Sequence, residues 1–303
     1  MKRLSLIAFS LTLSLSLASC QDKSELSPEI QSVVDAAKEG THVSYEDIME
    51  LSNNLSPHPQ GGDCWGNYFF QFVTNNSCFR VYDLLNKELV ATISIPRTEH
   101  GFVSNCHCNT ASFGAKYYDV EDEFPLLYVS TGYSSGGYTG ALVYRIVRHV
   151  DAFFITLVQT IRFPVLEGSS WTEFVPDNEY SYLCYTSERV IFKVKTPDIS
   201  EGDVIIDRSQ AIETYQFSPQ PDWMSTSRNQ DRIFYRGKIA FVSGVPQSGE
   251  ASAFVLLNLE TKEREKIIDF KKMGLKSESE SIFLWNGDLC VAFVDRIIKL
   301  NLE

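Results

Sequence analysis

Three features of the sequence predict an all-β fold. From residue 41 onward, short runs of apolar and aromatic residues alternate with turns rich in Gly, Pro, Asn, Asp and Ser, as in strands joined by tight connections. No amphipathic helical pattern longer than about two turns interrupts these runs. The runs also recur in groups, each opened by a polar stretch. A hydrophobic fraction of 44% is enough to fill a sizeable core.

The grouping predicts a single β-propeller of five four-stranded blades. The groups begin near residues 61, 106, 171, 225 and 277, and a period of roughly 45–65 residues with four strands each is typical of propeller blades. The third strands resemble one another, at 79–84, 142–146, 190–194 and 297–302. Six or seven blades would follow if the long connections 114–125 or 196–210 contain further strands.

Each expected strand is a run rich in β-branched and aromatic side chains. The first two groups comprise 61–65, 68–74, 78–84, 88–95 and then 106–113, 126–131, 141–147, 153–163. The next two comprise 171–175, 180–186, 190–195, 211–217 and then 225–235, 238–243, 253–259, 265–270. The fifth has only 278–285, 288–294 and 296–302.

The fifth group lacks an outer strand, and a long open edge invites aggregation. We expect the N-terminal stretch Thr41 to Leu51 to supply the missing strand, because His42-Val43-Ser44-Tyr45 is strand-like. This pairing would close the ring between the two ends of the domain. The alternative is a short helix over 45–51, whose sequence also allows one turn of amphipathic pattern.

The first 40 residues predict a leader and a tether. Two basic residues precede an apolar stretch, Leu4 to Leu17, which is too short for a membrane-spanning helix. It ends in Leu17-Ala18-Ser19-Cys20, which resembles the lipobox of bacterial lipoproteins, where the Cys is acylated and becomes the new N-terminus. The expected domains are a signal peptide at 1–19, lipidated Cys20 with a tether at 20–40, and the propeller at 41–303.

The residues after Cys20 bear on location. Gln21 follows it rather than Asp, which in lipoprotein sorting suggests the outer membrane. Asp22 and Glu25 resemble the acidic export signals of surface lipoproteins of Bacteroidetes. Each buried methylene of an acyl chain contributes about 0.8 kcal/mol to anchoring. The expected location is the cell envelope, with the protein lipid-anchored to the outer membrane and either surface-exposed or periplasmic.

Charge and motifs exclude several function classes. The net charge of −12 becomes −14 when the leader is removed, because 25 basic and 39 acidic side chains remain. Binding to nucleic acid needs a basic face, so no nucleic-acid partner is expected. The sequence contains no P-loop, no H-E-x-x-H, no C-x-x-C pair and no dinucleotide-binding glycine fingerprint. Their absence argues against nucleotide, zinc-protease and redox chemistry.

Six cysteines remain once Cys20 is assigned to lipid: Cys64, Cys78, Cys106, Cys108, Cys184 and Cys290. The envelope permits disulfides, but six cysteines in a domain of this size do not make a disulfide scaffold. The Cys106-His107-Cys108 segment has metal-binding residue types, yet no second ligand pair lies at zinc spacing. Buried strand cysteines are the favoured interpretation.

Two segments resemble those of the TolB-like and SMP-30-like β-propeller lipoproteins of Bacteroidetes. They are His107-x-Asn109 leading into 124–130, and Glu278-Ser279-Glu280-Ser281 leading into 282–289. The second is similar to the Glu-Pro-Glu-Gly segment that opens the last blade of such propellers, with Ser here in place of both Pro and Gly. The resemblance covers residues 60–303 and implies the fold. It implies no single activity, because these propellers include both enzymes and binding modules.

The expected site is the central channel, which the first strand of each blade lines. The residues expected to bind ligand are Trp65, His107, Asn109, Trp171, Asp177, Asp231 and Glu280. Their amides, carboxylates and indoles suit a sugar, with Trp65 or Trp171 stacking on the ring face. No cofactor is expected, although the carboxylates could hold Ca²⁺ through oxygen ligands. A solvated channel with hydrogen bonds between blades is the simpler interpretation.

These observations predict a lipid-anchored envelope protein that binds a carbohydrate or another envelope protein. One alternative is a channel-sited hydrolase, either a glycosidase or a calcium-dependent hydrolase or lactonase. A glycosidase would use Asp63, Glu173 and Glu278, which come from three blades. The other alternative is a structural partner in an outer-membrane complex.

Overall fold

The computed structural model describes residues 43–51, 58–74, 78–95, 107–132, 137–165, 172–185, 190–217, 229–235, 238–246, 249–250 and 252–302. The expected signal peptide, Cys20 and the tether lie outside these residues, and so do Trp171 and Cys106. In the described part of the chain, no helix is long and apolar enough to span a membrane.

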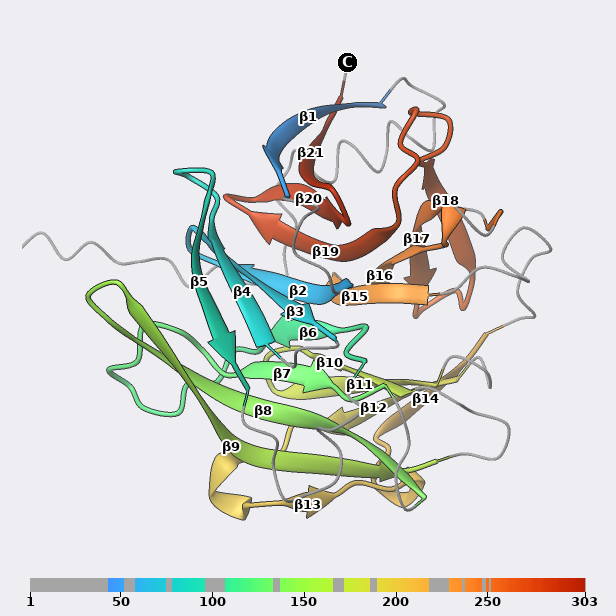
Figure 1. Ribbon diagram of the computed structural model, residues 1–303. Helices are drawn as coiled ribbons and strands as arrows, with labels where there is room; N and C mark the ends of the chain where they lie inside the picture. The colour runs from blue at the N-terminus through green and yellow to red at the C-terminus, as the bar shows by residue number, and fades with distance from the viewer. Residues whose placement is uncertain are drawn as a thin grey trace, which may run out of the picture.

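The chain folds into a ring of five β-sheets, which confirms the predicted five-bladed propeller (Figure 1). Blade 1 contains β2 (Pro59–Trp65), β3 (Tyr68–Val73), β4 (Cys78–Asp83) and β5 (Glu88–Ser94). Blade 2 contains β6 (Ala111–Phe113), β7 (Leu127–Ser130), β8 (Tyr138–His149) and β9 (Ala152–Pro164). Blade 3 contains β10 (Thr172–Pro176), β11 (Tyr180–Tyr185), β12 (Val190–Lys195) and β14 (Glu213–Gln216). Blade 4 contains β15 (Asn229–Tyr235), β16 (Lys238–Ser243), β17 (Ala253–Asn258) and β18 (Arg264–Asp269). Blade 5 contains β19 (Ser279–Trp285), β20 (Asp288–Phe293), β21 (Arg296–Leu302) and β1 (Val43–Glu50).

The N-terminal strand closes the ring, as predicted, and the helix alternative for 45–51 is wrong. β1 pairs antiparallel with β21 from Val43 opposite Leu302 to Glu50 opposite Arg296. The Leu51 amide extends the pairing to the Asp295 carbonyl at 2.8 Å. Blade 5 therefore has no open outer edge along β21.

Two elements differ from the prediction. The connection 196–210 does contain a strand, β13 (Val204–Ile205), with the 3₁₀ helices η2 (Ile199–Glu201) and η3 (Arg208–Gln210) around it. This strand pairs parallel with β9 and becomes the fifth strand of blade 2, so the blade number stays five. β6 is shorter than expected because Cys108 has a φ of 50° and its carbonyl accepts from Gly61 of blade 1 at 3.0 Å.

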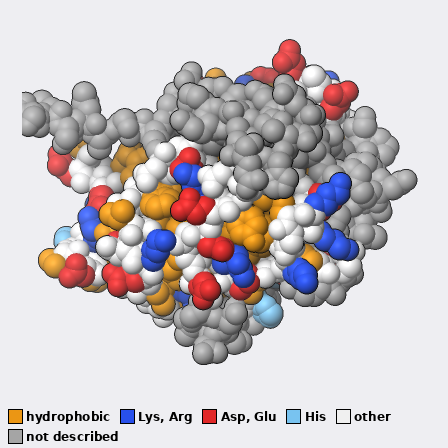
Figure 2. Space-filling model, turned by 90° about the horizontal axis from the view of Figure 1, so that it is seen from above, with side chains coloured by type: hydrophobic (Ala, Val, Ile, Leu, Met, Phe, Trp, Pro, Cys, Tyr) orange, Lys and Arg blue, Asp and Glu red, His pale blue; other side chains and the backbone are white. Residues whose placement is uncertain are grey.

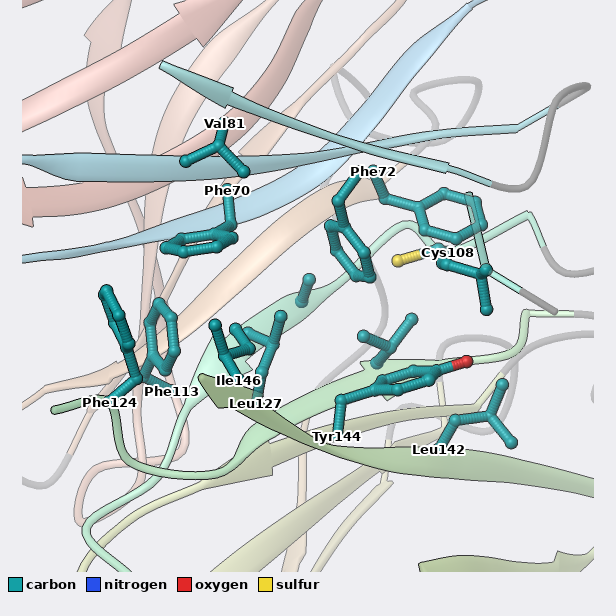
Figure 3. Close-up of a cluster of buried hydrophobic side chains, with 14 of the residues drawn as sticks. Phe70, Phe72, Val81, Cys108, Phe113, Phe124, Leu127, Leu142, Tyr144 and Ile146 are labelled. Atoms are coloured by element: carbon teal, nitrogen blue, oxygen red, sulfur yellow. The ribbon is translucent and has the colours of Figure 1, made fainter. Parts of the chain in front are cut away.

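The apolar core is divided into five clusters, one between each pair of neighbouring blades. Between blades 1 and 2, Phe70 and Phe72 pack over Phe113, Phe124 and the apolar side chains of β7 and β8 (Figure 3). The Phe70 ring meets those of Phe113 and Phe124 edge to face, with centroids 5.5 Å apart in both pairs. Such geometry contributes about 0.5–1.5 kcal/mol per pair beyond the buried area.

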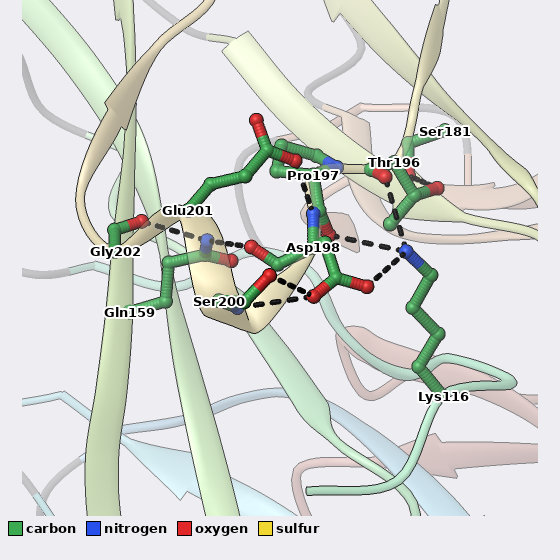
Figure 4. Close-up of polar contacts among 9 residues, drawn as sticks. All are labelled: Lys116, Gln159, Ser181, Thr196, Pro197, Asp198, Ser200, Glu201 and Gly202. Carbon is green, nitrogen blue, oxygen red and sulfur yellow. Dashed lines mark hydrogen bonds and ion pairs between the residues drawn. The ribbon is translucent and has the colours of Figure 1, made fainter.

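A polar clasp joins the connection 196–203 to blade 2 (Figure 4). The Gln159 amide of β9 donates to the carbonyls of Asp198 and Gly202 at 2.9 and 2.7 Å. Lys116, from the loop before β7, donates to the carbonyls of Thr196 and Pro197 and pairs with the Asp198 carboxylate at 3.6 Å. The clasp holds β13 against β9 and so ties blade 3 to blade 2.

The surface carries acidic and basic side chains side by side, with apolar side chains between them (Figure 2). Several of these charges are paired, as in Arg145 with Asp122 and Arg148 with Glu123, both at 2.7 Å. The five cysteines in the described residues, Cys64, Cys78, Cys108, Cys184 and Cys290, are buried and form no disulfide. Burial raises the pKa of Cys184 and of Cys290.

Candidate functional site

The first strands of the five blades, β2, β6, β10, β15 and β19, meet at the axis of the ring. β2 and β6 run in the same direction, because positions 61 and 63 meet positions 108 and 113 in turn. β6 and β15 also run in the same direction, because positions 109 and 112 meet positions 229 and 232 in turn. Ser112 beside β15 and Asn109 before β6 show how close they lie: Ser112 Oγ donates to the Arg232 carbonyl at 3.2 Å, and Asn109 Nδ2 donates to the Asn229 carbonyl at 3.1 Å. Blades 2 and 4 are not neighbours, so both hydrogen bonds cross the axis.

Two glycines of β2 permit this close approach. A Cβ on Gly61 would lie 2.3 Å from the Asn109 carbonyl oxygen, and a Cβ on Gly62 would lie 2.5 Å from the Phe70 carbonyl oxygen. Both are backbone atoms that cannot move aside cheaply. A larger residue at position 61 would therefore push blade 1 away from blade 2, and one at position 62 would disturb the pairing of β2 with β3 inside blade 1.

The carboxylates of Asp63 and Asp231 are held by backbone amides. Asp63 accepts from its neighbour Cys64 and from Phe113 of blade 2, both at 2.8 Å. Asp231 accepts from Gly62 and Ile282 at 3.3 Å, which lie on blades 1 and 5. Asp231 is fully buried, and burial raises the pKa of its carboxyl well above the usual range, with the nearby charge of Asp63 adding to the effect and the backbone amides opposing it.

Glu173 forms a buried ion pair with Arg232. The carboxylate of Glu173 on β10 accepts from Nε of Arg232 on β15, and both side chains are at most 3% exposed. The Arg232 guanidinium also lies 4.9 Å above the Phe241 ring. Asp63 and Glu173, two of the three acids expected for a glycosidase, thus join neighbouring blades.

A second group of polar side chains gathers where the inner strands begin. β2, β15 and β19 each carry a β-bulge near their first residues, and bulges often re-aim side chains next to functional sites. The polar cluster, as we call it, consists of Gln60, Asn109, Asn229, Gln230, Glu278 and Glu280. Within it, Gln230 Nε2 donates to Glu278 Oε1 at 2.6 Å, and next to it Ser281 Oγ donates to the Gln60 carbonyl at 3.0 Å.

The polar cluster contains buried oxygens that have no hydrogen-bond donor among the described residues. They are Gln60 Oε1, Asn109 Oδ1, Asn229 Oδ1 and Glu280 Oε2, with the hydroxyls of Thr110 and Ser279 beside them. Each such atom costs about 1–3 kcal/mol when it is buried without a partner. Asn229 and Glu278 are half-buried, so the cluster lies at the end of the axis that solvent reaches. A ligand with several donors would satisfy these oxygens.

Glu280 is the titratable group of the polar cluster whose pKa is most clearly shifted. Its side chain is 2% exposed. Burial raises the pKa of its carboxyl well above the usual range, and the charge of Glu278 raises it further. Glu280 is therefore protonated at a pH where an exposed glutamate is ionised.

The remaining predicted residues lie in two places. His107 and Asn109 precede β6 at the same end as the polar cluster, and His107 is half-buried. Trp65 ends β2, about 16 Å along the strand from Gln60 at 3.3 Å per residue, and its indole N–H donates to the Glu123 carbonyl at 3.1 Å. Asp177 follows the end of β10 and so also lies toward the far end. His107, Asn109, Glu278 and Glu280 thus precede or begin inner strands, whereas Trp65 and Asp177 lie at or beyond strand ends.

Sequence reasoning missed Gln60, Gln230 and Arg232. A signal for the two glutamines exists: Trp65, Tyr235 and Trp285 each end an inner strand, and the residue five positions earlier is Gln60, Gln230 or Glu280. Aligning the inner strands on that aromatic residue would have revealed the cluster. The described residues contain no group of three or more His, Cys, Asp or Glu side chains placed to hold a metal ion.

Comparison with known proteins supports the fold alone. No protein-family model matches the chain, and no curated protein matches it in sequence. Among solved structures, it is similar to the glutaminyl cyclase of Myxococcus xanthus, with a TM-score of 0.51 and 12% identity over 87% of this chain and 99% of that one. The PQQ-bound aldose sugar dehydrogenase of Streptomyces coelicolor matches with a TM-score of 0.40 and 8% identity, over 87% and 99%. A resemblance to TolB-like and SMP-30-like lipoproteins stays a prediction.

Proposed function

We propose that this chain is a lipid-anchored envelope protein that binds a carbohydrate at its polar cluster. The observation that carries the proposal is the set of buried oxygens without donors, on Gln60, Asn109, Asn229 and Glu280. Sugar hydroxyls are donors that can satisfy amide and carboxyl oxygens of this kind. Cys20 in its lipobox-like sequence supports the anchor.

The proposal requires that the polar cluster bind a ligand even though its unpaired oxygens lower the stability of the free protein. Gln60 is 4% exposed, and its Oε1 has no donor among the described residues. A methionine of similar shape would remove this buried polar atom. On this proposal, the protein has glutamine and not methionine at position 60 because a bound ligand donates a hydrogen bond to Gln60 Oε1.

The test compares glycan binding and stability in Gln60→Met. The purified domain, residues 41–303, is screened on a glycan array, and the affinity for the best glycan is measured by calorimetry. Gln60→Met should weaken binding about tenfold, which is the loss of one hydrogen bond worth roughly 1.4 kcal/mol, and should leave the free energy of unfolding equal or higher. Gln216→Met, on the exposed outer strand β14, is the matched control. A domain that binds no glycan, or a Gln60→Met variant that binds as well as wild type, contradicts the proposal.

The anchor has its own test. Cys20→Ala should move the protein from the membrane fraction to the soluble fraction and abolish incorporation of labelled palmitate. If the wild-type protein binds no glycan but co-purifies with outer-membrane proteins, the structural-partner alternative replaces the carbohydrate proposal.

One observation favours a hydrolase as the second candidate. Glu278 accepts a hydrogen bond from Gln230, and it lies beside Glu280, whose carboxyl has a raised pKa. A carboxyl group with a raised pKa next to a second carboxyl group is a common arrangement in glycoside hydrolysis. Turnover of a glycan that Glu280→Gln abolishes would favour this candidate over binding alone.

A further inference from the structure

The inner strands carry more acidic than basic side chains. β2, β6, β10, β15 and β19 together contain four acidic side chains, Asp63, Glu173, Asp231 and Glu280, and a single basic one, Arg232. Burial favours the neutral form of the Asp231 and Glu280 carboxyls. Arg232 is paired with Glu173. Glu278 adds a further acid immediately before β19. At the end where the polar cluster lies, the acidic side chains of Glu278 and Glu280 have no basic side chain beside them among the described residues of the inner strands, because Arg232 is paired with Glu173.

Glu280 differs from the other three acids in its charged and backbone contacts. Asp63 and Asp231 accept hydrogen bonds from backbone amides, and Glu173 pairs with Arg232, although its Oε1 has no partner among the described residues. In the described part of the chain, no donor reaches Glu280 Oε2, which is buried. Its only charged neighbour of consequence is Glu278, which repels it.

The other unsatisfied side-chain amide oxygens of the cluster can only accept hydrogen bonds. These are Oε1 of Gln60 and Oδ1 of Asn109 and Asn229. The Asn109 amide is oriented by its hydrogen bond to the Asn229 carbonyl, which leaves its oxygen as the free acceptor. A protonated primary amine carries three donors, no acceptor and a positive charge, so it complements this set more fully than a hydroxyl group does.

We propose that the polar cluster receives the protonated amine of an amino sugar, which lies against Glu280 and the amide oxygens around it. This inference rests on the proposed carbohydrate function and names the class of sugar. The described residues contain no group of three or more His, Cys, Asp or Glu side chains placed to hold a metal ion. Calcium also accepts amide oxygens as ligands, so it is tested below as a competitor.

Binding of an amine should release a proton. In the free protein the Glu280 carboxyl is neutral, because it is buried beside Glu278. Asp231 of β15 is an ionisable group that contacts β19, because it accepts from the Ile282 amide. An ammonium group placed next to Glu280 stabilises its ionised form, so the carboxyl gives up its proton to solvent as the ion pair forms.

The experiment compares glucosamine, N-acetylglucosamine and glucose by calorimetry with the intact domain, at a pH below the pKa of the sugar amine. Glucosamine should bind on the order of tenfold more tightly than the two neutral sugars, because charge-assisted hydrogen bonds are about twice as strong as neutral ones. Repeating the titration in buffers of different ionisation enthalpy should show proton release for glucosamine only. A calcium salt serves as a further arm and should not compete with glucosamine.

The variants localise the effect. In Glu280→Gln the affinity ratio of glucosamine to N-acetylglucosamine should fall to about one, and proton release should disappear. Glu263→Gln, an exposed acid in the β17–β18 connection, is the matched control and should keep both. Equal affinity for the three sugars in wild type, or an unchanged ratio in Glu280→Gln, overturns the inference. Competition by calcium also overturns it, in favour of a cation site.

A sugar-free measurement separates this inference from the proposed function. Infrared difference spectra follow the neutral carboxyl of Glu280 as methylammonium is added. Loss of its band in wild type, with no such band in Glu280→Gln, supports the amine site even when no sugar binds. Binding of neutral sugars with no preference for glucosamine and no spectral change retains the carbohydrate function and rejects the amine site. Failure of both measurements rejects both.

Discussion

At the residue scale, the axis shows three ways of holding a buried carboxyl group. Backbone amides hold Asp63 and Asp231, a guanidinium holds Glu173, and no described donor holds Glu280 Oε2. The first two arrangements connect blades, although Glu173 Oε1 has no hydrogen-bond partner among the described residues. The third is incomplete, and it is the arrangement on which a ligand can act.

Removing one partner of the Glu173–Arg232 pair should be costly. Breaking a buried ion pair leaves an uncompensated charge and typically costs about 3–5 kcal/mol. Glu173→Gln should therefore lower the free energy of unfolding by that order in urea denaturation. Glu213→Gln breaks the exposed pair with Lys193 and should change it by less than about 1 kcal/mol. A Glu173→Gln variant of wild-type stability would return Glu173 to the list of candidate catalytic acids.

The raised pKa of Glu280 predicts a pH dependence of stability with a definite sign. Between the ordinary pKa of a glutamate and its raised value in the fold, the folded protein holds a proton that the unfolded chain has lost, so stability falls as pH rises. Glu280→Gln removes this loss. Its free energy of unfolding relative to wild type should increase from pH 4 upward, measured by urea titrations at several pH values. Glu260→Gln, on an exposed turn, should show no such trend.

At the element scale, strands were predicted well where apolar residues alternate or cluster, as in 190–195 and 288–294. Their packing between blades requires this pattern, so the pattern is present in the sequence. The bulges at the starts of β2, β15 and β19 depend on pairing with another strand, and no local signal announces them. For that reason Glu280 and Asn109 could be proposed from residue type, but their grouping with Gln60 and Gln230 could not.

β13 illustrates the same limit in a short element. Two residues cannot display a period, and Val204–Ile205 is a strand because β9 offers it a free edge and the clasp holds it there. Gln159→Leu would leave the carbonyls of Asp198 and Gly202 without their shared donor. We expect a loss of roughly 2 kcal/mol in unfolding free energy and faster amide hydrogen exchange over 198–206. Ser200→Ala, at an exposed position of the same turn, is the milder control, and equal effects of the two changes would mean that Gln159 does not hold the clasp.

At the scale of the whole molecule, the ring depends on joining the two ends of the domain. β1 contributes Ile48 and Met49, and the next residue but one, Leu51, joins them in the core between blades 5 and 1. The sequence predicted this closure because the last group was one strand short. It predicted five blades because the apolar runs fall into five groups, and the strand in the connection 196–210 joins blade 2 without adding a blade.

A chain that begins at residue 58 should expose β21 as an open edge. We expect it to be less stable than the chain beginning at residue 41 and to associate or aggregate through that edge, as light scattering would show. A synthetic peptide of residues 41–51 added in trans should restore the monomer. If the shortened chain stays monomeric with an unchanged unfolding transition, β1 is dispensable for closure.

The hydrogen bonds that cross the axis also bear on the rigidity of the ring. Asn109 reaches blade 4 from blade 2, and Asp231 reaches blade 1 from blade 4, so the inner strands are joined across the axis as well as around it. A displacement of one inner strand at this level is therefore resisted by blades that are not its neighbours in the ring.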